Sequence, residues 1–297
     1  MSKQKRTLDV ILAVVMVLLC LLWIYPIVLI LLNSLKTEGS FTTSTVFRLP
    51  TAETFAGLRN YVYGVTKMNF LSSMGYSLLI TITSVVLILL CCSMTGWYLT
   101  RVNNKLSKFM NLLIVFSMVV PFQMVMFTLS KTADRLKLNT PWNICIIYLG
   151  FGAGLAVFMF TGFMKSVPME IEEAAMIDGC NEVGIFFRIV MPLARGMIAA
   201  VTLFIAVINW NDYYSYMMFI GNKTKLQPFA WVLHRMLTDK SLMNQVRNGA
   251  ASLGFTLPPP MALRMATIIC ATLPIIIIYP FIQPYFTQGM TLGAVKE

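Results

Sequence analysis

Six long apolar runs, separated by shorter polar segments, set the pattern of this chain. The runs occupy residues 10–32, 74–100, 109–130, 142–164, 196–220 and 265–287. A helix rises about 1.5 Å per residue, so a run of about 20 apolar residues can cross the roughly 30 Å hydrocarbon core of a bilayer. The pattern therefore predicts an all-α integral membrane protein with six transmembrane helices, which form a single domain over residues 1–297.

The first run follows a basic amino end with Lys3, Lys5 and Arg6, and this arrangement is also typical of a secretory signal peptide. The apolar part of a signal peptide has about 7 to 15 residues, however, and a cleavage site of small residues follows it. The run at 10–32 is longer and has no such site after it. We therefore expect a retained first span.

Composition agrees with a membrane location. Hydrophobic residues make up 58% of the chain and charged residues 12%, whereas soluble proteins have about 25% charged residues. The net charge of +11 comes from basic residues spread over loops and ends, which favours contact with anionic lipid headgroups. We expect membrane lipid, and no nucleic acid, as a partner.

Cysteine and histidine residues give no reason to expect a metal or a cofactor. The six cysteines form no CxxC pair, and five of them lie in apolar runs, where cysteine acts as a small hydrophobic side chain. His234 is the only histidine. We expect no structural disulfide, no metal site and no cofactor.

The segment 166–192, between the fourth and fifth runs, differs from the rest of the chain in its charge. It holds five of the twelve acidic residues, namely Glu170, Glu172, Glu173, Asp178 and Glu182. Ser166 as an N-cap and Pro168 in the first turn predict a short helix here, because both residue types favour helix starts. Carboxylates near such a start are stabilised by the helix dipole.

A break and a second short helix should follow. Gly179 can take the left-handed conformation that ends a helix, and Asn181 offers a second N-cap. Apolar residues then recur at helical spacing until Pro192, which we expect to end the second helix. Such an exposed amphipathic hairpin suits a partner surface, although an ordinary acidic loop between two spans is the alternative from this pattern alone.

The same segment carries a family resemblance. Glu173-Ala174-Ala175, three residues, Gly179, nine residues and Ile189-Val190-Met191-Pro192 are similar to the EAA motif of ABC importer membrane subunits, with Met191 where the family usually has Leu. Over nearly its whole length the chain resembles the maltose-type second permease (MalG-like) of sugar importers. Weaker supports are Asp178-Gly179, Trp210-Asn211-Asp212 and the ending 289–297.

The resemblance implies the type I ABC importer permease fold and a coupling role for the segment 166–192. In that family the segment forms coupling helices that dock on a cytoplasmic ATPase subunit. The residues that match the motif here are Glu173, Ala174, Ala175, Asp178, Gly179, Ile189 and Pro192. The resemblance further implies a second, MalF-like permease, a dimer of ATP-binding subunits, an extracellular solute-binding protein and a sugar substrate, with an oligosaccharide favoured.

Energy for transport has to come from another chain. The sequence has no G-x-x-x-x-G-K-[ST] phosphate loop, so we expect ATP hydrolysis on a separate subunit and no enzymatic activity here. The segment 150–154, GFGAG, could be mistaken for a nucleotide-binding fingerprint. Because no strand precedes it, we interpret these glycines as helix-packing positions.

Polar residues gather in the outer third of the fifth run. Asn209, Asp212, Tyr213 and Tyr216 follow one another at i, i+3, i+4 and i+7, which predicts a single polar face on one helix. Either this face lines the substrate path, or it is an interfacial belt of aromatic residues with a polar helix end. In the third run, Pro121 predicts a kink that turns inward.

The sequence indicates the number of spans more clearly than their orientation in the membrane. Lys and Arg are nearly evenly divided between the two sides, but dense clusters at 3–6 and 101–108 favour a cytoplasmic amino end. With six spans, both termini and the segment 166–192 would then be cytoplasmic, in a multi-pass protein of the cell membrane.

The sequence pattern alone is compatible with functions other than sugar import. A permease for a non-sugar solute fits the same pattern. An ion-coupled secondary transporter would need ionisable groups near the membrane midplane, and Asp212 lies toward one end of its run. A membrane enzyme would need a catalytic constellation, and the glutamates at 170–173 have no nearby His or Cys partner in the sequence.

Overall fold

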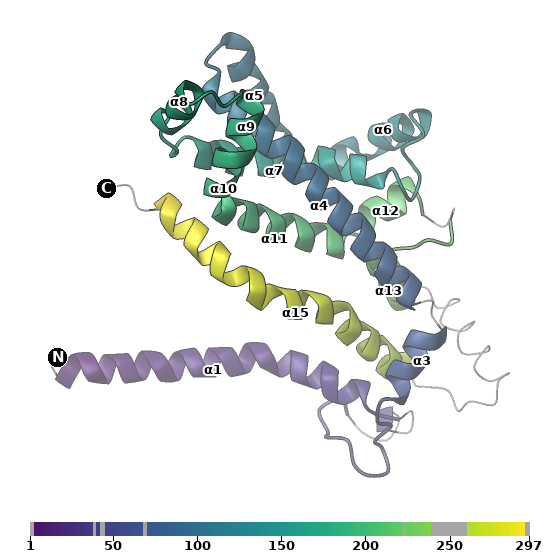
Figure 1. Ribbon diagram of the computed structural model, residues 1–297. Helices are drawn as coiled ribbons and strands as arrows, with labels where there is room; N and C mark the ends of the chain where they lie inside the picture. Colours follow the sequence, from purple (N-terminus) through teal and green to yellow (C-terminus); the bar gives the residue numbers. More distant parts are fainter. Residues whose placement is uncertain are drawn as a thin grey trace. The chain divides into compact units, whose positions relative to one another are not determined.

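The computed structural model describes residues 3–37, 40–41, 45–67, 70–221, 224–238 and 260–294 (Figure 1). Within these ranges the chain is helical, and the only strand-like pairing is an isolated bridge between Lys36 and Phe55. Two compact units can be distinguished. The first comprises Met1–Leu71 and Leu233–Leu273, and the second comprises Ser72–Val232 and Pro274–Glu297.

The first unit contains α1 (Lys3–Ser34), α3 (Arg59–Lys67), the end of α13 (Phe229–Thr238) and the start of α15 (Pro260–Ala294). None of the most apolar 18-residue window of α1 is buried inside the chain. Its carboxyl end is tied to α3, because Asn60 donates hydrogen bonds to the carbonyls of Ser34 (2.7 Å) and Lys36 (3.1 Å).

The second unit is built on α4 (Phe70–Arg101), α7 (Ile144–Met164) and α11 (Arg195–Asn211). They share a core in which Ile88, Phe160 and Ile205 are fully or almost fully buried. Glycines allow the helices to approach. A Cβ atom on Gly96 would lie 2.7 Å from Cβ of Phe160, and one on Gly152 would lie 2.7 Å from Cδ1 of Ile88. These distances are too short for any larger residue without movement of its neighbour.

The glycines of the segment 150–154 therefore do pack helices, as predicted, but not all of them. A Cβ atom on Gly154 would lie 2.7 Å from Cγ of Met118 on α5 (Lys105–Val119). Gly150 faces open space, with no atom within 4 Å of such a Cβ. Within the segment 150–154, Gly152 and Gly154 are thus the glycines that neighbouring helices approach closely.

The third apolar run is broken far more sharply than a kink. α5 and α6 (Phe122–Arg135) meet at 108°. Pro121 lies between them and has no backbone N–H to continue α5. Val120 takes an extended conformation (φ −75°, ψ 115°), as residues before proline tend to do.

Four described helices are long and apolar enough to cross a membrane, and the number rises to six if each of two bent pairs counts as one span. One bent pair is α5 with α6, and the other joins Glu182–Leu193 to α11 at 78°. α15 stays helical through Pro274, Pro280 and Pro284. The described part of the chain is thus an all-α membrane protein in which two of the six apolar runs belong to bent helix pairs.

Candidate functional site

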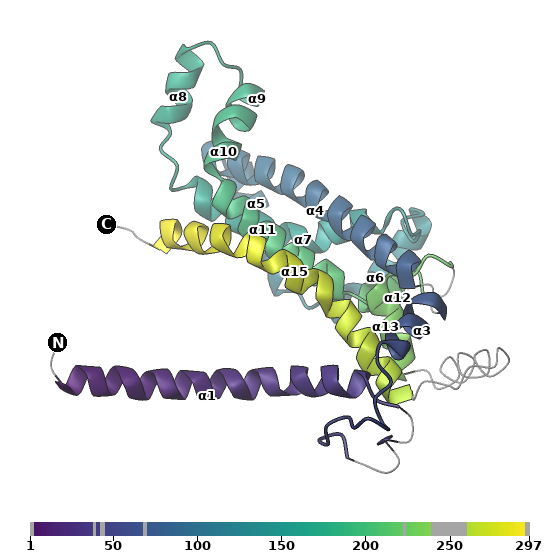
Figure 2. The same cartoon turned by 60° about the horizontal axis from the view of Figure 1, so that its bottom comes forward.

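The acidic segment forms a helical hairpin, seen side by side in Figure 2 as α8 (Glu170–Ile177) and α9 (Glu182–Ile185). Gly179 has φ +84°, and its N–H donates to the carbonyl of Met176 (3.0 Å) while the N–H of Cys180 donates to that of Ala175 (2.9 Å). This is the hydrogen-bond pattern of a Schellman helix end. Asn181 caps α9, because its Oδ1 accepts from the N–H of Gly184 at 2.8 Å. The predicted break at Gly179 and the cap at Asn181 are confirmed.

The predicted start of the first helix is wrong. α8 begins at Glu170, and Pro168 precedes it. Ser166 belongs to the end of α7, where its hydroxyl donates to the carbonyl of Phe163 at 2.7 Å. A serine hydroxyl can satisfy a helix carbonyl as readily as it can cap a helix start, so its residue type alone did not distinguish the two ends.

The predicted end of the second helix at Pro192 is met to within one residue, because the helical segment that begins at Glu182 ends at Leu193. After α9 the chain widens into a π-helical turn at Phe186–Val190 and continues through α10 (Met191–Leu193). Proline lacks an N–H and its ring clashes with the carbonyl four residues earlier. The wider turn, in which the N–H of Met191 donates to the carbonyl of Phe186, accommodates Pro192 in the last turn of the helix.

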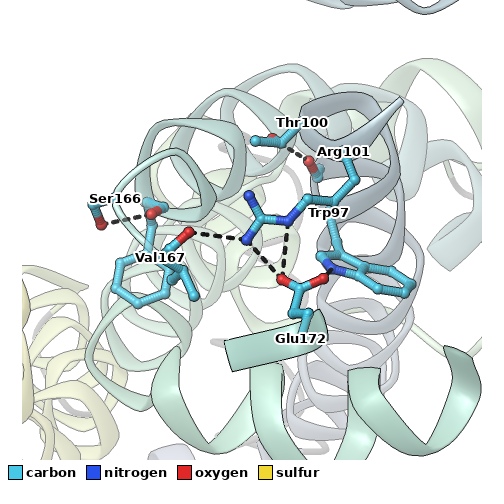
Figure 3. A network of polar contacts seen from close by, with 8 residues as sticks. Trp97, Thr100, Arg101, Ser166, Val167 and Glu172 are labelled. Atoms are coloured by element: carbon cyan, nitrogen blue, oxygen red, sulfur yellow. Dashed lines mark hydrogen bonds and ion pairs between the residues drawn. The ribbon is translucent and has the colours of Figure 1, made fainter. Parts of the chain in front are cut away.

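A buried ion pair ties α8 to the end of α4. Glu172, which is 1% exposed, accepts hydrogen bonds from Nε (2.9 Å) and Nη2 (2.6 Å) of Arg101 and from the indole N–H of Trp97 (3.0 Å). Nη2 of Arg101 also donates to the carbonyl of Val167 at 3.0 Å, so the guanidinium joins both ends of the α7–α8 connection (Figure 3). Both carboxylate oxygens of Glu172 are thereby satisfied, which a buried charge requires.

The residues of the EAA motif divide into an outer and an inner group. Glu173, Ala174, Asp178 and Gly179 are exposed, whereas Ile189 and Pro192 are partly buried. Ala175 is 6% exposed and packs in the core with Ile185, Phe186 and Val190. The outer face also carries apolar side chains, most prominently Ile177, which is 87% exposed. The hairpin thus offers an apolar and acidic surface while its inner face is held by its own chain.

Sequence reasoning missed the three residues that hold the hairpin: Trp97, Arg101 and Glu172. Arg101 was noticed only as part of a basic cluster, and Glu172 only as one of three adjacent glutamates. Seventy-one positions separate the two charged residues along the chain. A charged pair in an otherwise apolar protein was the available signal, but nothing in the spacing indicates which carboxylate is buried.

The polar face predicted on the fifth run does not exist as one helix face. α11 ends at Asn211, Asp212 is extended (ψ 112°), and α12 (Tyr214–Phe219) starts anew. Oδ1 of Asp212 accepts from the N–H groups of Tyr214 and Ser215, both at 3.1 Å. Aspartate readily satisfies backbone N–H groups at a helix start, and this competes with a continuous helix.

The four predicted residues consequently have different surroundings. Asn209 and Asp212 line a cavity of about 320 Å³. Tyr213 is exposed. Tyr216 is fully buried in a cluster with Tyr76 and Trp231, and its hydroxyl donates to the carbonyl of Leu226. The structure brings Asn209 and Asp212 together and separates them from the two tyrosines.

Comparison with known proteins identifies the family. Residues 92–292 match the model of the family described as "Binding-protein-dependent transport system inner membrane component". The chain belongs to this family. The match includes the hairpin, the Arg101–Glu172 pair and the break at Asp212. It makes the chain a multi-pass membrane component of a transport system and not an enzyme.

Two relatives match this transport component over nearly all of its length. Protein LplC of Bacillus subtilis (strain 168) is 31% identical over 274 residues, which cover 92% of this chain and 89% of the relative. The probable starch degradation products transport system permease protein AmyC of Thermoanaerobacterium thermosulfurigenes is 30% identical over 285 residues, which cover 95% of this chain and 94% of the relative.

The fold has a solved counterpart. A bacterial ABC transporter involved in the import of the acidic polysaccharide alginate contains a chain that matches with a TM-score of 0.82 at 24% identity, over 96% of this chain and 99% of that chain. The predicted all-α fold of an ABC importer permease is confirmed. The resemblance drawn from the EAA motif is confirmed with it.

Proposed function

We propose that this chain is the pore-forming permease subunit of an ATP-driven importer that carries a sugar, with an oligosaccharide favoured, across the cell membrane. The observation that carries the proposal is the hairpin of α8 and α9, which exposes Ala174 and Ile177 while Glu172 anchors it to α4. An anchored, partly apolar projection is suited to receive movement from a partner. In the proposed orientation of the chain in the membrane, both termini and the hairpin lie on the cytoplasmic side.

The sugar substrate is supported by what the similar proteins are named for. AmyC is named for starch degradation products, and the solved structure is of an alginate importer. A non-sugar solute remains the alternative within the same family. Ion-coupled transport and membrane enzyme chemistry are not supported, since the family is defined by dependence on a binding protein.

The proposed assembly has four kinds of partner around this chain: a second, MalF-like permease, two ATP-binding subunits, an extracellular solute-binding protein and the sugar. The two permeases would enclose the path, and closure of the ATPase pair would rock them between outward and inward states. The apolar face of α1, which is unburied in the chain, suits contact with lipid or with the second permease.

Within the hairpin the motif residues would have three roles. Glu173, Ala174 and Asp178 would meet the ATPase, because they are exposed. Gly179 would permit the turn between the helices, and Ala175, Ile189 and Pro192 would hold the turn against the membrane part of the chain. In the substrate path, Asn209 and Asp212 are the favoured contacts, with Tyr213 at the exposed margin and Tyr216 supporting the wall from the core.

Ala174→Trp tests the coupling role. The bulky side chain would overpack the contact with the ATPase at a cost of about 1 to 3 kcal/mol, while the exposed position leaves folding unaffected. In the reconstituted complex, we expect sugar uptake and binding-protein-stimulated ATP hydrolysis to fall together. The matched control is Ala52→Trp, at an exposed alanine of the first loop. Full stimulation of both variants would show that the hairpin is not the coupling element.

The class of transport is tested by co-purification. An affinity-tagged form of this chain should bring down an ATP-binding subunit in stoichiometric amount, and absence of such a subunit would reject the ABC importer. Uptake of labelled sugars then separates a carbohydrate importer from one for another solute.

A further inference from the structure

A basic turn lies at the end of the second unit that is opposite the hairpin (Figure 1). It comprises Lys131 and Arg135 of α6 and Lys137 of the following loop, and all three side chains are exposed. α7 connects this turn to the hairpin, and its 21 residues rise about 31 Å, roughly the thickness of the hydrocarbon core of a bilayer. In the proposed orientation of the chain, the basic turn therefore lies on the extracellular side.

The positive charges of the basic turn are not neutralised by the described part of the chain. Asp134 is the only acidic residue in the segment 131–141, and its Oδ1 accepts from Nδ2 of Asn139 at 2.5 Å. None of the three basic side chains makes an ion pair with a described residue. Lys131 and Arg135 are one turn apart on the same face of α6, so their positive potentials add. Such a surface attracts an acidic partner.

The basic turn has a fixed shape that strains its backbone. α6 ends in a Schellman pattern, in which the N–H of Leu138 donates to the carbonyl of Ala133 (2.8 Å) and the N–H of Lys137 donates to that of Asp134 (3.1 Å). Lys137 has φ +55° at the position that glycine usually occupies in this motif. Nδ2 of Asn143 donates to the carbonyl of Lys137 at 3.0 Å and holds it there. Because stability alone would favour glycine at this position, a lysine indicates a use for its side chain.

A hollow beside the basic turn has room for a side chain of a partner. It has a volume of about 670 Å³ and lies between the end of α6 and the residues 217–221 at the end of α12. Lys131 lines it, and the hydroxyl of Ser130 donates to the carbonyl of Met218 at 3.3 Å, which joins its two walls. An acidic side chain that enters the hollow would meet the ammonium group of Lys131.

Apolar side chains next to the charges suit a protein surface. Leu136 and Trp142 are 64% and 61% exposed, on either side of Lys137 in the sequence. Aromatic residues together with arginine are enriched in protein interfaces, although aromatic and basic residues also occur where a protein meets lipid headgroups. Fluid headgroups adapt to any arrangement of positive charges, whereas a rigid surface lowers the entropic cost of binding a folded protein. The strained, fixed turn therefore favours a protein partner.

We propose that the basic turn and the hollow beside it form a docking site for an acidic surface of the extracellular solute-binding protein, with Lys131, Arg135 and Lys137 as the charged contacts. The inference rests on the proposed function, which includes this partner. It adds the place of contact, on α6 and α12, and the sign of the charge that the partner carries. Opposite charges accelerate the encounter of the two proteins and make it dependent on salt.

The test measures ATP hydrolysis by the complete complex in phosphatidylcholine nanodiscs against the concentration of binding protein. The probe is the purified solute-binding protein that stimulates the wild-type complex. Lys131→Glu should raise the half-stimulating concentration by about threefold to tenfold, because it replaces an attraction with a repulsion of similar size. The increase should shrink at high salt, where exposed charges are screened.

Lys137→Gly separates docking from stability. Glycine adopts φ +55° without strain, so the thermal stability of this variant should not fall. Loss of the charge should still raise the half-stimulating concentration by about twofold to fivefold, a combination that a purely structural lysine would not give. The matched control is Lys108→Glu, which makes the same charge change as Lys131→Glu at an exposed position of α5 and should leave the half-stimulating concentration unchanged.

Half-stimulating concentrations equal to the wild-type value in both variants would overturn the docking site. They would leave the proposed function standing, because the complex would still respond to its binding protein. Nanodiscs that contain phosphatidylglycerol test the lipid alternative. If this lipid raises the thermal stability of the wild type but not of Lys131→Glu, and the half-stimulating concentration is unchanged, the basic turn binds headgroups instead. A chain that brings down no ATP-binding subunit would reject the proposed function itself.

Discussion

Adjacent glutamates in α8 have opposite environments, and single residues therefore decide what the hairpin can do. The carboxylate of Glu172 is buried on Arg101 and Trp97, whereas Glu173 is exposed. The two differ by one step of about 100° around the helix, so one faces the protein and the next faces outward. Glu172, which anchors the hairpin, and Glu173, which belongs to its exposed face, are therefore neighbours in the sequence.

Glu172→Gln should destabilise the protein, and Glu173→Gln should not. The first change removes the charge that receives two hydrogen bonds from Arg101, for which about 1.5 to 3 kcal/mol is typical. The second alters an exposed side chain, where effects stay within about 0.5 kcal/mol. Thermal unfolding in detergent and proteolysis of residues 166–192 provide the measurements. Equal stability of the two variants would contradict the anchoring role of Glu172.

The course of the chain between helices was only partly predictable, and the failures share a cause. Gly179 and Asn181 act through their own backbone geometry, so sequence sufficed to locate the break and the cap. At Ser166 and Asp212 the outcome depends on competition between backbone and side-chain hydrogen bonds within one turn. The residue type indicates which hydrogen bonds are possible at such a position, but the surrounding structure determines which of them forms.

Gly179→Ala tests whether the turn requires a left-handed residue. A Cβ atom at this position would meet nothing within 4 Å, so any cost comes from the positive φ alone, for which about 1 to 2 kcal/mol is expected. The matched control is Gly162→Ala in α7, which also has open space but no positive φ and should be neutral or slightly stabilising. Thermal stability of the two variants should therefore move in different directions. A loss no larger at Gly179 than at Gly162 would show that the turn tolerates a side chain.

For the whole molecule, sequence predicted the membrane class, the family and the position of the hairpin in the chain. It did not predict that two apolar runs belong to helix pairs bent by 108° and 78°. Apolar patterning reports that a segment avoids water, and it carries no information on the direction of the segment in the bilayer. The contact of Arg101 with Glu172 was equally inaccessible, because it depends on how α4 and α8 pack.

The proposed orientation predicts which side of the membrane labels reach. In a cysteine-free background, Asn181→Cys should react with an impermeant thiol reagent only after the membrane is opened. Lys240→Cys, in the second long loop and outside the described residues, should react in intact protoplasts. A basic amino end is expected on the cytoplasmic side, and the hairpin shares that side if six spans are present. The reverse labelling pattern would invert the topology.

The anchor on Glu172 has a counterpart at the far end of the same helix. About 37 Å from Arg101 along α4, the hydroxyl of Tyr76 donates to the carbonyl of Pro141 at 2.5 Å, and Oγ of Ser77 accepts from the N–H of Phe229 at 2.7 Å. α4 is therefore held by side-chain hydrogen bonds near both of its ends. If α8 receives movement from a partner, α4 offers a direct helical connection from α8 to the segment before α7 and to the start of α13.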